Sequence, residues 1–397
     1  MLEKLIKNKN KRILLALTAG HMINDSYSGF LAPLLPLLME RLGFSIAVVG
    51  MLASVFTFSS SFLQPLYGWL HDLLGKRAFV YSAPFVTAFF LCLAGFAPSV
   101  GVLAFLLFLS GCGTAAYHPA GSAAVARVSE KNAGWSMSLF LTAGNFGYSL
   151  GPVIVVPAVA LLGFEFLPLV TLPAVLIFFV LFKLTPAAEK RQIARKPVLQ
   201  DIFTPKLLSI GLHQFMAIAR ASTITSIVTF LPLLLMERGV PLFWGGLSLS
   251  LLIALGSIAT LLGGYLYDRV NRKRLLFFSF LGSLPFLFFS LQIQSVWSIA
   301  ILLAGSSILY LTLTVNVVMS QELFPGREGT MAAMMIGLGW GTAGLLMTPV
   351  GFLAEAYSLT FALKCILGFH SLAIIASLLL PIQKYATSYL EPAENVA

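Results

Sequence analysis

Long runs of apolar residues, separated by short polar segments, repeat along the whole chain. Twelve such runs can be counted, each bounded by charged residues, glycine or proline, and they cover residues 13–39, 45–70, 78–97, 101–126, 133–160, 164–183, 207–236, 243–267, 275–293, 296–320, 329–354 and 358–380. An α-helix needs about 20 mostly apolar residues to cross the hydrocarbon core of a bilayer. The runs are too long and too uniformly apolar for the alternating strands of a barrel, so the pattern predicts an all-α membrane protein with twelve transmembrane helices.

The composition agrees with a membrane protein that has little soluble mass. Of the 397 residues, 58% are hydrophobic and 10% are charged, whereas soluble domains carry about 25% charged residues. The net charge of +10 alone would suggest nucleic acid as a partner, but the basic residues stand in short segments between apolar runs. We therefore expect the lipid bilayer, and no nucleic acid, as the partner of these residues.

The basic residues also predict the orientation in the membrane. If the N-terminus is placed inside, 21 of the 25 Lys and Arg residues fall on inner segments, and inner loops of membrane proteins carry such an excess. We expect both termini to be cytoplasmic and the protein to lie in the inner (plasma) membrane of a cell. The first apolar run is too long for the core of a signal peptide, which predicts an uncleaved first span.

The two halves of the chain repeat each other. GWLHDLLGKR (68–77) matches GYLYDRVNRK (264–273), and PLLMERLG (36–43) matches PLLLMERG (232–239), both at a shift of 196 in the numbering, which we call the repeat offset. A basic segment that contains three prolines separates six runs from six. The pattern predicts an N-terminal six-helix bundle at 1–183, a cytoplasmic linker at 184–206, and a C-terminal six-helix bundle with a short cytoplasmic tail at 207–397.

The repeated motif carries a resemblance to a known family. GWLHDLLGKR resembles the loop 2–3 signature of the major facilitator superfamily, and GYLYDRVNRK resembles its degenerate second copy. HMIND (21–25), AYHPAGS (116–122), ARASTITSIVTFLPLLL (219–235) and QELFPGREGT (321–330) resemble the fosmidomycin-resistance group of bacterial exporters. The resemblance implies the MFS fold, in which two six-helix halves are related by a pseudo-two-fold axis along the membrane normal, and the first and seventh spans line a central cavity.

The first apolar run contains an ionisable cluster in its middle. Asp25 is the sole acid at mid-depth in any run, where a charge facing lipid costs roughly 2.5–3.5 kcal/mol or more. His21 lies four residues earlier, on the same helix face, and Asn24 is adjacent. We expect these residues to hold a proton or a cationic group. The alternative is a hydrogen-bonded structural pair.

Arg220 is the sole arginine at mid-depth, and it lies in the seventh run. Its guanidinium can bind a carboxylate or phosphonate through two hydrogen bonds, or it can neutralise Asp25, and the sequence leaves both open. His213 and Gln214 lie about two turns nearer the cytoplasm. They either line an inner vestibule or cap the helix at the interface.

Other polar residues inside apolar runs are weaker candidates for the same site. Tyr117 and His118 precede Pro119, which frees a backbone carbonyl and bends a helix. His118 is then either a cavity ligand and second proton site, or a structural histidine at a kink. Asn145 and Asn316 are candidates of the same kind.

A second group of residues is expected to control gating. Asp72 and Asp268 each follow the cytoplasmic end of a run, and the resemblance implies that such an aspartate latches one end state. Gly68, Arg77 and Arg127 belong to the same group. The alternative is a solvated loop carboxylate. This interpretation is stronger for Asp268 than for Asp72, because Asn271 replaces the signature glycine.

The fifth run resembles the signature of antiporters. GYSLGP (147–152) matches it, but Val155 stands where a further glycine is expected. Small residues spaced by four also let helices approach closely, so close packing is the alternative. The same reasoning assigns the glycine-rich run 337–351 to close packing.

No enzyme motif is present, and the three cysteines lie inside apolar runs without metal-ligand spacing. We expect no enzyme, no metal site and no cofactor. The sequence favours a monomeric secondary transporter that moves a small molecule by alternating access. The leading expectation is a proton-coupled antiporter that exports a drug-like or anionic compound, such as a phosphonate-type antibiotic. The alternatives are proton-coupled uptake of a small organic anion or metabolite, a lipid flippase, and a membrane-embedded enzyme.

Overall fold

The structure is a computed structural model that describes residues 9–74, 77–128, 133–185, 206–267, 269–295, 297–323, 331 and 334–381. Within these ranges the side chains of 72, 73, 126, 133–135 and 138 are not described. Every regular element in the described residues is helical, which confirms the all-α prediction.

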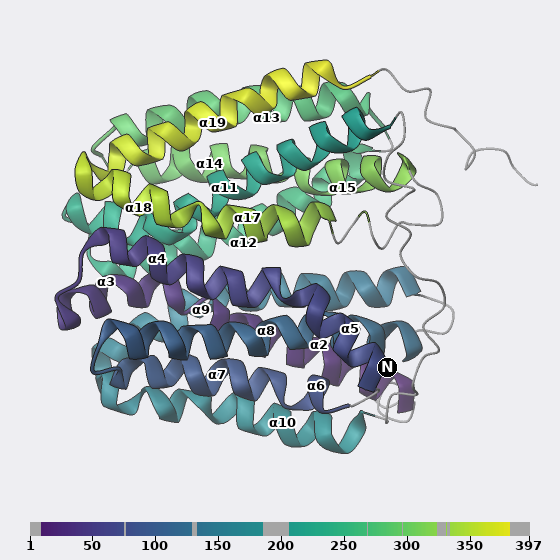
Figure 1. Cartoon of the computed structure of the whole chain (residues 1–397), viewed down its shortest axis with the longest axis vertical. Helices are drawn as coiled ribbons and strands as arrows, with labels where there is room; N and C mark the ends of the chain where they lie inside the picture. Colours follow the sequence, from purple (N-terminus) through teal and green to yellow (C-terminus); the bar gives the residue numbers. More distant parts are fainter. Residues whose placement is uncertain are drawn as a thin grey trace, which may run out of the picture.

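The N-terminal half consists of helices that run back and forth through the bundle. In chain order they are α2 (Lys9–Ser28), α3 (Leu31–Leu42), α4 (Ile46–Thr57), the π-helical turn η1 (Phe58–Phe62), α5 (Gln64–Leu74), α6 (Ala78–Tyr81), α7 (Ala83–Leu93), η2 (Ala94–Phe96), α8 (Val100–Val128), α9 (Ala133–Leu162), η3 (Phe164–Thr171) and α10 (Leu172–Leu184). Figure 1 shows them, purple to blue, in the lower half of the molecule.

The C-terminal half has the same plan. It consists of α11 (Leu207–Glu237), α12 (Leu242–Tyr267), α13 (Arg272–Gln292), α14 (Trp297–Tyr310), α15 (Thr312–Leu323), a second π-helical turn η5 (Met334–Leu338), α17 (Gly339–Leu345), α18 (Met347–Ala356) and α19 (Leu359–Leu379). These helices, teal to yellow, form the upper half of Figure 1. The bounds predicted for the two bundles remain a prediction, because residues 186–205 lie outside the described residues.

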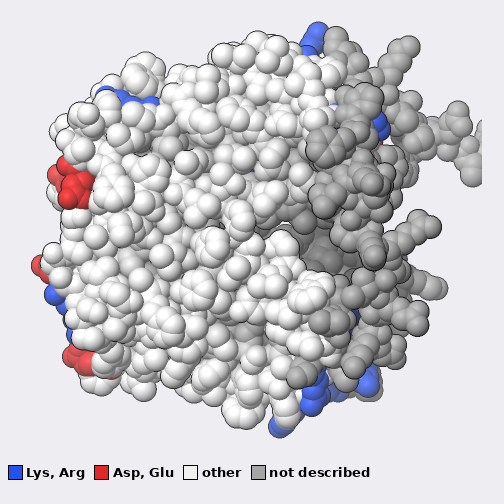
Figure 2. Space-filling model, in the orientation of Figure 1, with Lys and Arg blue, Asp and Glu red and all other residues white. Residues whose placement is uncertain are grey.

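The helices of the described residues make twelve passes through the bundle. Ten helical segments of the described residues are long and apolar enough to cross a membrane. The other two passes are interrupted: α2 and α3 are separated at Gly29 and Phe30, and α6 and α7 are separated at Ser82. Figure 2 shows acidic and basic side chains at two opposite ends of the molecule, with an uncharged band between them.

The internal repeat is visible in equivalent hydrogen bonds. The Tyr117 hydroxyl on α8 donates to the Leu17 carbonyl on α2 at 2.6 Å. In the other half, the Asn316 amide on α15 donates to the His213 carbonyl on α11 at 2.9 Å. Leu17 and His213 are separated by the repeat offset, so the same pair of helices is joined at the same place in both halves.

We call the end of the bundle with Thr185 and Lys206 the linker end, and the end with the Gly43–Ser45 turn the distal end. Toward the distal end the two halves pack closely: α4 lies on α18, and α9 lies on α12. A Cβ on Gly351 would lie 3.0 Å from the Ala47 carbonyl oxygen. The predicted role of the run 337–351 in close packing matches this contact. Figure 2 shows a hollow between the halves toward the linker end, at the border of the described residues.

Candidate functional site

Asp25 is the centre of a polar cluster between α2 and α8. Its Oδ2 lies 3.2 Å from Nε2 of His21, and its Oδ1 lies 3.0 Å from Nε2 of His118. The Asn24 side-chain amide donates to the same Oδ1 at 2.8 Å. The His21 and Asp25 side chains are 5% and 13% exposed, whereas His118 is 29% exposed. The structure therefore brings together the ionisable residues predicted from two distant parts of the sequence.

Local sequence explains how these side chains meet. His21 and Asp25 are four residues apart, so they project from one face of α2. The glycines of α9 let that helix pack directly on this face: a Cβ on Gly144 would lie 2.5 Å from Nε2 of His21 and 2.8 Å from Oδ2 of Asp25. Gly147, in the same run, packs on the backbone of Met22. The glycine spacing of α9 thus has a packing role next to the cluster.

The contacts of His21 allow the cluster to take up an extra proton. Its Nδ1 lies 2.8 Å from the Phe140 carbonyl oxygen, which only accepts, so Nδ1 carries a hydrogen. Its Nε2 faces a carboxylate oxygen. A neutral ring with its hydrogen on Nδ1 presents a lone pair to this oxygen, whereas an imidazolium would form an ion pair with it. The pair can therefore hold one exchangeable proton.

His118 carries its hydrogen on the other ring nitrogen. The Gln64 side-chain amide on α5 donates to the Ser60 carbonyl at 2.9 Å and lies 3.1 Å from Nδ1 of His118. An amide NH₂ group only donates, so Nδ1 of His118 accepts and its Nε2 carries the hydrogen that points at Asp25. His118 is therefore neutral in this arrangement.

The same three side chains have the spacing of a metal site. The ligand atoms of His21, Asp25 and His118 lie within 4.8 Å of one another, close enough to surround an ion. A metal needs a lone pair on the nitrogen that faces it, but Gln64 holds His118 with a hydrogen on Nε2. The donor set fits a proton better than a metal ion.

Arg220 on α11 is buried without a carboxylate partner. Its side chain is 1% exposed, and its Nε and Nη1 have no hydrogen-bond acceptor. The guanidinium lies 5.2 Å from the centre of the Trp340 ring. In the described residues the ion pairs within 4.0 Å join Asp25 to the two histidines and Arg272 to Glu322. Of the two roles left open for Arg220, direct neutralisation of Asp25 does not occur in this conformation.

The remaining predicted binding residues lie in different environments. His213 Nδ1 is 2.5 Å from Oδ1 of Asn316, and both side chains are buried. The Gln214 amide is buried with both its nitrogen and its oxygen unpaired. Tyr117 is fully buried and joins α8 to α2, so its contacts are structural. Asn145 is exposed, one turn before Tyr148 on α9.

The predicted gating residues are described only in part. Arg77 donates to the Phe182 and Thr185 carbonyls at 3.4 Å, at the end of α10. Lys273, its equivalent at the repeat offset, donates to the Leu378 carbonyl at 2.7 Å, at the end of α19. In both halves a cation after the repeated motif binds the last carbonyls of a helix, where the helix dipole favours positive charge.

The other four members of the gating group can be placed only briefly. Gly68 packs on Pro119, 3.4 Å from where its Cβ would be, and Arg127 is exposed. Asp268 and the side chain of Asp72 lie outside the described residues.

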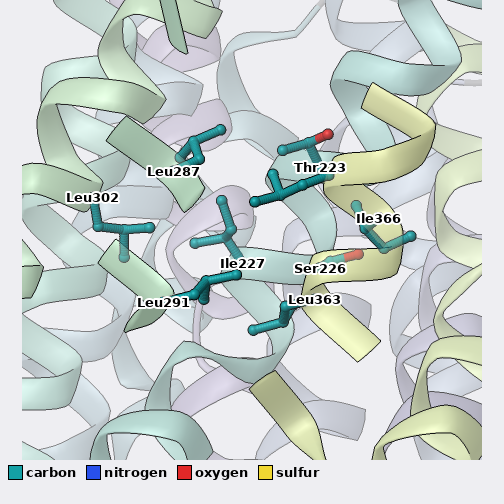
Figure 3. Close-up of a pocket in the computed structure, with 9 residues that line it drawn as sticks. Thr223, Ser226, Ile227, Leu287, Leu291, Leu302, Leu363 and Ile366 are labelled. Carbon is teal, nitrogen blue, oxygen red and sulfur yellow. The ribbon is translucent and has the colours of Figure 1, made fainter. Parts of the chain in front are cut away.

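A buried histidine that the sequence analysis did not select lies in the C-terminal half. His370 on α19 has Nδ1 at 3.3 Å from the Thr223 hydroxyl and Nε2 at 3.2 Å from the Ser283 hydroxyl. Thr223 also lines a small cavity of about 10 Å³, shown in Figure 3 with Leu287 and Ile366. That volume holds about one water molecule, so the cavity is too small to be a substrate site.

A twelve-pass helical bundle with buried ionisable side chains in each half is the architecture of a membrane transporter. The chain belongs to the Major Facilitator Superfamily, whose family model matches residues 17–348. It is therefore a multi-pass secondary transporter of small molecules and not an enzyme.

Individual relatives cover nearly the whole chain. Over 383 residues it is 26% identical to the Fosmidomycin resistance protein of Escherichia coli (strain K12), covering 94% of this chain and 93% of that protein. It is 28% identical over 385 residues to the uncharacterized MFS-type transporter YfnC of Bacillus subtilis (strain 168), with coverage of 94% and 93%. Among solved structures, a D-xylose-proton symporter matches with a TM-score of 0.76 at 14% identity, covering 95% of this chain and 98% of that one. The predicted resemblance to the fosmidomycin-resistance group is confirmed.

Proposed function

We propose that this protein is a proton-coupled antiporter that exports a small anionic or drug-like compound, such as a phosphonate, from the cytoplasm. The observation that carries the proposal is the buried contact between His21 and Asp25, in which Nδ1 of His21 is used by the Phe140 carbonyl and Nε2 faces the carboxylate. A buried site with one exchangeable proton is what coupling to a proton gradient requires.

Arg220 supports an anionic substrate. A buried guanidinium with two unpaired donor nitrogens can accept a phosphonate or carboxylate through charge-assisted hydrogen bonds. Trp340 holds the guanidinium by a cation–π contact, and this leaves its edge free to bind a ligand. The anion group thus lies in the C-terminal half, and the proton group lies in the N-terminal half.

The direction of transport rests on two further supports. The excess of basic residues assigns the linker end to the cytoplasm, and the hollow of Figure 2 is toward that end. The name of the Escherichia coli relative describes resistance to fosmidomycin. We extend removal of such a compound to this chain, acting as a monomer with the proton as coupling ion. The second candidate is proton-coupled uptake of an organic anion. It uses the same Arg220, but the proton and the anion move in the same direction.

Transport in proteoliposomes separates the two candidates. Protein is reconstituted into vesicles, fosmidomycin is the probe, and a pH gradient of either sign is imposed. An antiporter accumulates the probe in the more acidic compartment, whereas a symporter accumulates it in the more alkaline compartment. A matched sample with Asp25→Asn shows whether the accumulation uses the cluster. Equal distribution under both gradients in the wild-type protein would exclude proton coupling for this probe.

A further inference from the structure

Gln64 is a polar residue that links the proton cluster to the interface between the two halves. It begins α5, directly after the π-helical turn η1. Its amide nitrogen has two hydrogens, and both are used: one for the Ser60 carbonyl and one for Nδ1 of His118. One amide group therefore bridges the turn and the cluster.

The sequence explains why the turn needs Gln64. In a π-helical turn the carbonyl of residue 60 would accept from the backbone N–H of residue 65. Residue 65 is proline, which has no N–H and disfavours a regular helix through this segment. The side chain of Gln64 supplies the missing donor to Ser60.

The turn η1 also contacts the other half of the molecule. A Cβ on Gly341 of α17 would lie 3.3 Å from Cε2 of Phe62, and η1 further contacts the second π-helical turn, η5. The hydrogen bonds therefore run from the Asp25 carboxylate through His118 and Gln64 to Ser60 of η1. This turn is the segment of the N-terminal half that packs on α17.

We propose that Gln64 is a positioning residue that couples protonation of His118 to the contact between η1 and α17. The proposal rests on the proposed function and names a device within that site. With neutral His118, the Gln64 amide satisfies both Nδ1 and Ser60, and η1 is held against α8. When His118 takes a proton on Nδ1, that nitrogen becomes a donor and faces the amide donor. Gln64 must then turn its oxygen to His118, Ser60 loses its partner, and η1 is released from its contact with α17.

The groups that face His118 are few. Asp25 and His21 of α2 are its ionisable neighbours, with the His21 and His118 rings 5.0 Å apart. His71 lies on α5 two turns beyond Gln64, against Phe79. The described parts of α4, η1, α7 and α9 that pack on α8 contain no Asp, Glu, Lys or Arg. His118 is also the most exposed member of the cluster, so a proton from solvent reaches its ring first.

Three variants test this. Gln64→Met fills the same space but donates no hydrogen bond. Gln64→Glu places an acceptor beside Nδ1 and favours the protonated ring. The matched control is Thr260→Ala: Thr260 is the equivalent of Gln64 at the repeat offset, and it donates to the Gly256 carbonyl at 2.9 Å, the equivalent bond in the other half.

The readout is the distance between spin labels at Leu66 and Ile336, two exposed positions on α5 and η5. Labels are placed in a background without Cys92, Cys112 and Cys365, and spectra are recorded without substrate from pH 5 to 9. The expected result is a distance that increases as pH falls in the wild-type protein and in Thr260→Ala. Gln64→Met and Gln64→Glu cannot donate to Ser60, so both variants should hold the longer distance at every pH.

An unchanged pH response in Gln64→Met would overturn the inference, and if that variant does not fold, an unchanged pH response in Gln64→Glu would do so. Transport by Asp25→Asn, measured in parallel, separates this outcome from failure of the proposed function. Loss of the Gln64 effect with Asp25-dependent transport intact overturns only the role of Gln64. Proton-driven transport that persists in Asp25→Asn overturns the proposed function.

Discussion

At the scale of single residues, the sequence located Asp25 and His21 but not the atoms that set their protonation. The four-residue spacing and the depth in the first apolar run are properties of the sequence. The acceptor for Nδ1 of His21 is the backbone carbonyl of Phe140, 119 residues away. No side-chain pattern encodes a carbonyl contact of that kind, because it depends on how α9 packs against α2.

Arg220 shows a similar limit. Its depth in the seventh run made it a candidate, and the sequence left open whether it pairs with Asp25. The structure places it beside Trp340 instead, on a helix much later in the chain. Pairing between two single charges on different helices depends on the rotation of both helices, which apolar runs of nearly uniform hydrophobicity leave undetermined.

A buried, unpaired guanidinium destabilises the ligand-free protein. We predict that Arg220→Met raises the free energy of unfolding by about 1–3 kcal/mol, because unpaired buried donors are removed and the space is filled. The same variant should lose stabilisation by an anionic ligand, since binding to the native state alone raises stability. Thermal unfolding with and without fosmidomycin measures both effects.

The conservative variant is the control for charge. Arg220→Lys keeps the charge but loses the planar fork, so we expect weak residual binding of the anion. Equal ligand stabilisation in the wild-type protein and in Arg220→Met would leave Arg220 with a structural role alone.

At the scale of elements, α9 shows what glycine does in this bundle. We predict that Gly144→Ala displaces His21 and costs about 1–3 kcal/mol, because overpacking a close helix contact forces neighbouring side chains to move. It should also change the pH dependence of transport.

The matched control is Gly368→Ala on α19, where an added Cβ meets nothing within 4 Å. That change should be neutral or slightly stabilising, since alanine favours a helix over glycine. Thermal unfolding of the two variants compares them directly, and equal effects would contradict the close contact on α2.

The π-helical turn η1 is an element that the sequence analysis did not predict. The second apolar run reads as one continuous helix, and its Pro65 alone could have marked a local departure. Gln64 is not a candidate from the sequence either, because a single glutamine near the end of a span can have many roles. Its partner His118, 54 residues away, becomes visible only in three dimensions.

At the scale of the whole molecule, the internal repeat predicted more than the fold. Equivalent hydrogen bonds at Leu17 and His213, and equivalent helix ends bound by Arg77 and Lys273, follow the repeat offset. The functional residues do not follow it: Asp25 corresponds to Ala221, and Arg220 corresponds to Asn24. Shared contacts preserve the fold in both halves, whereas Asp25 and Arg220 each occur in one half alone.

The halves are held together at the distal end by Glu355. It accepts hydrogen bonds from the Ser45 hydroxyl at 2.6 Å and from the Ala47 backbone N–H at 3.2 Å, at the beginning of α4. A carboxylate at a helix beginning is favoured by the helix dipole. We predict that Glu355→Gln weakens this closure and shifts the population toward a conformation open at the distal end by about tenfold, or about 1.4 kcal/mol.

Labelling of an engineered cysteine at Ala47 measures that population, because Ala47 is buried against Gly351 when the distal end is closed. Faster labelling in Glu355→Gln than in an otherwise identical protein supports the contact as a latch. Identical labelling rates would show that close packing of α4 on α18 is sufficient by itself.

The central claim is that the proton stored between His21 and Asp25 drives transport. The most direct measurement compares two kinds of flux in proteoliposomes that contain Asp25→Asn: accumulation of fosmidomycin under a pH gradient, and exchange of labelled for unlabelled fosmidomycin without a gradient. Asparagine keeps the size of the side chain but cannot take up the proton. The account predicts that exchange persists while gradient-driven accumulation is abolished. Accumulation by Asp25→Asn at the wild-type level would contradict the account.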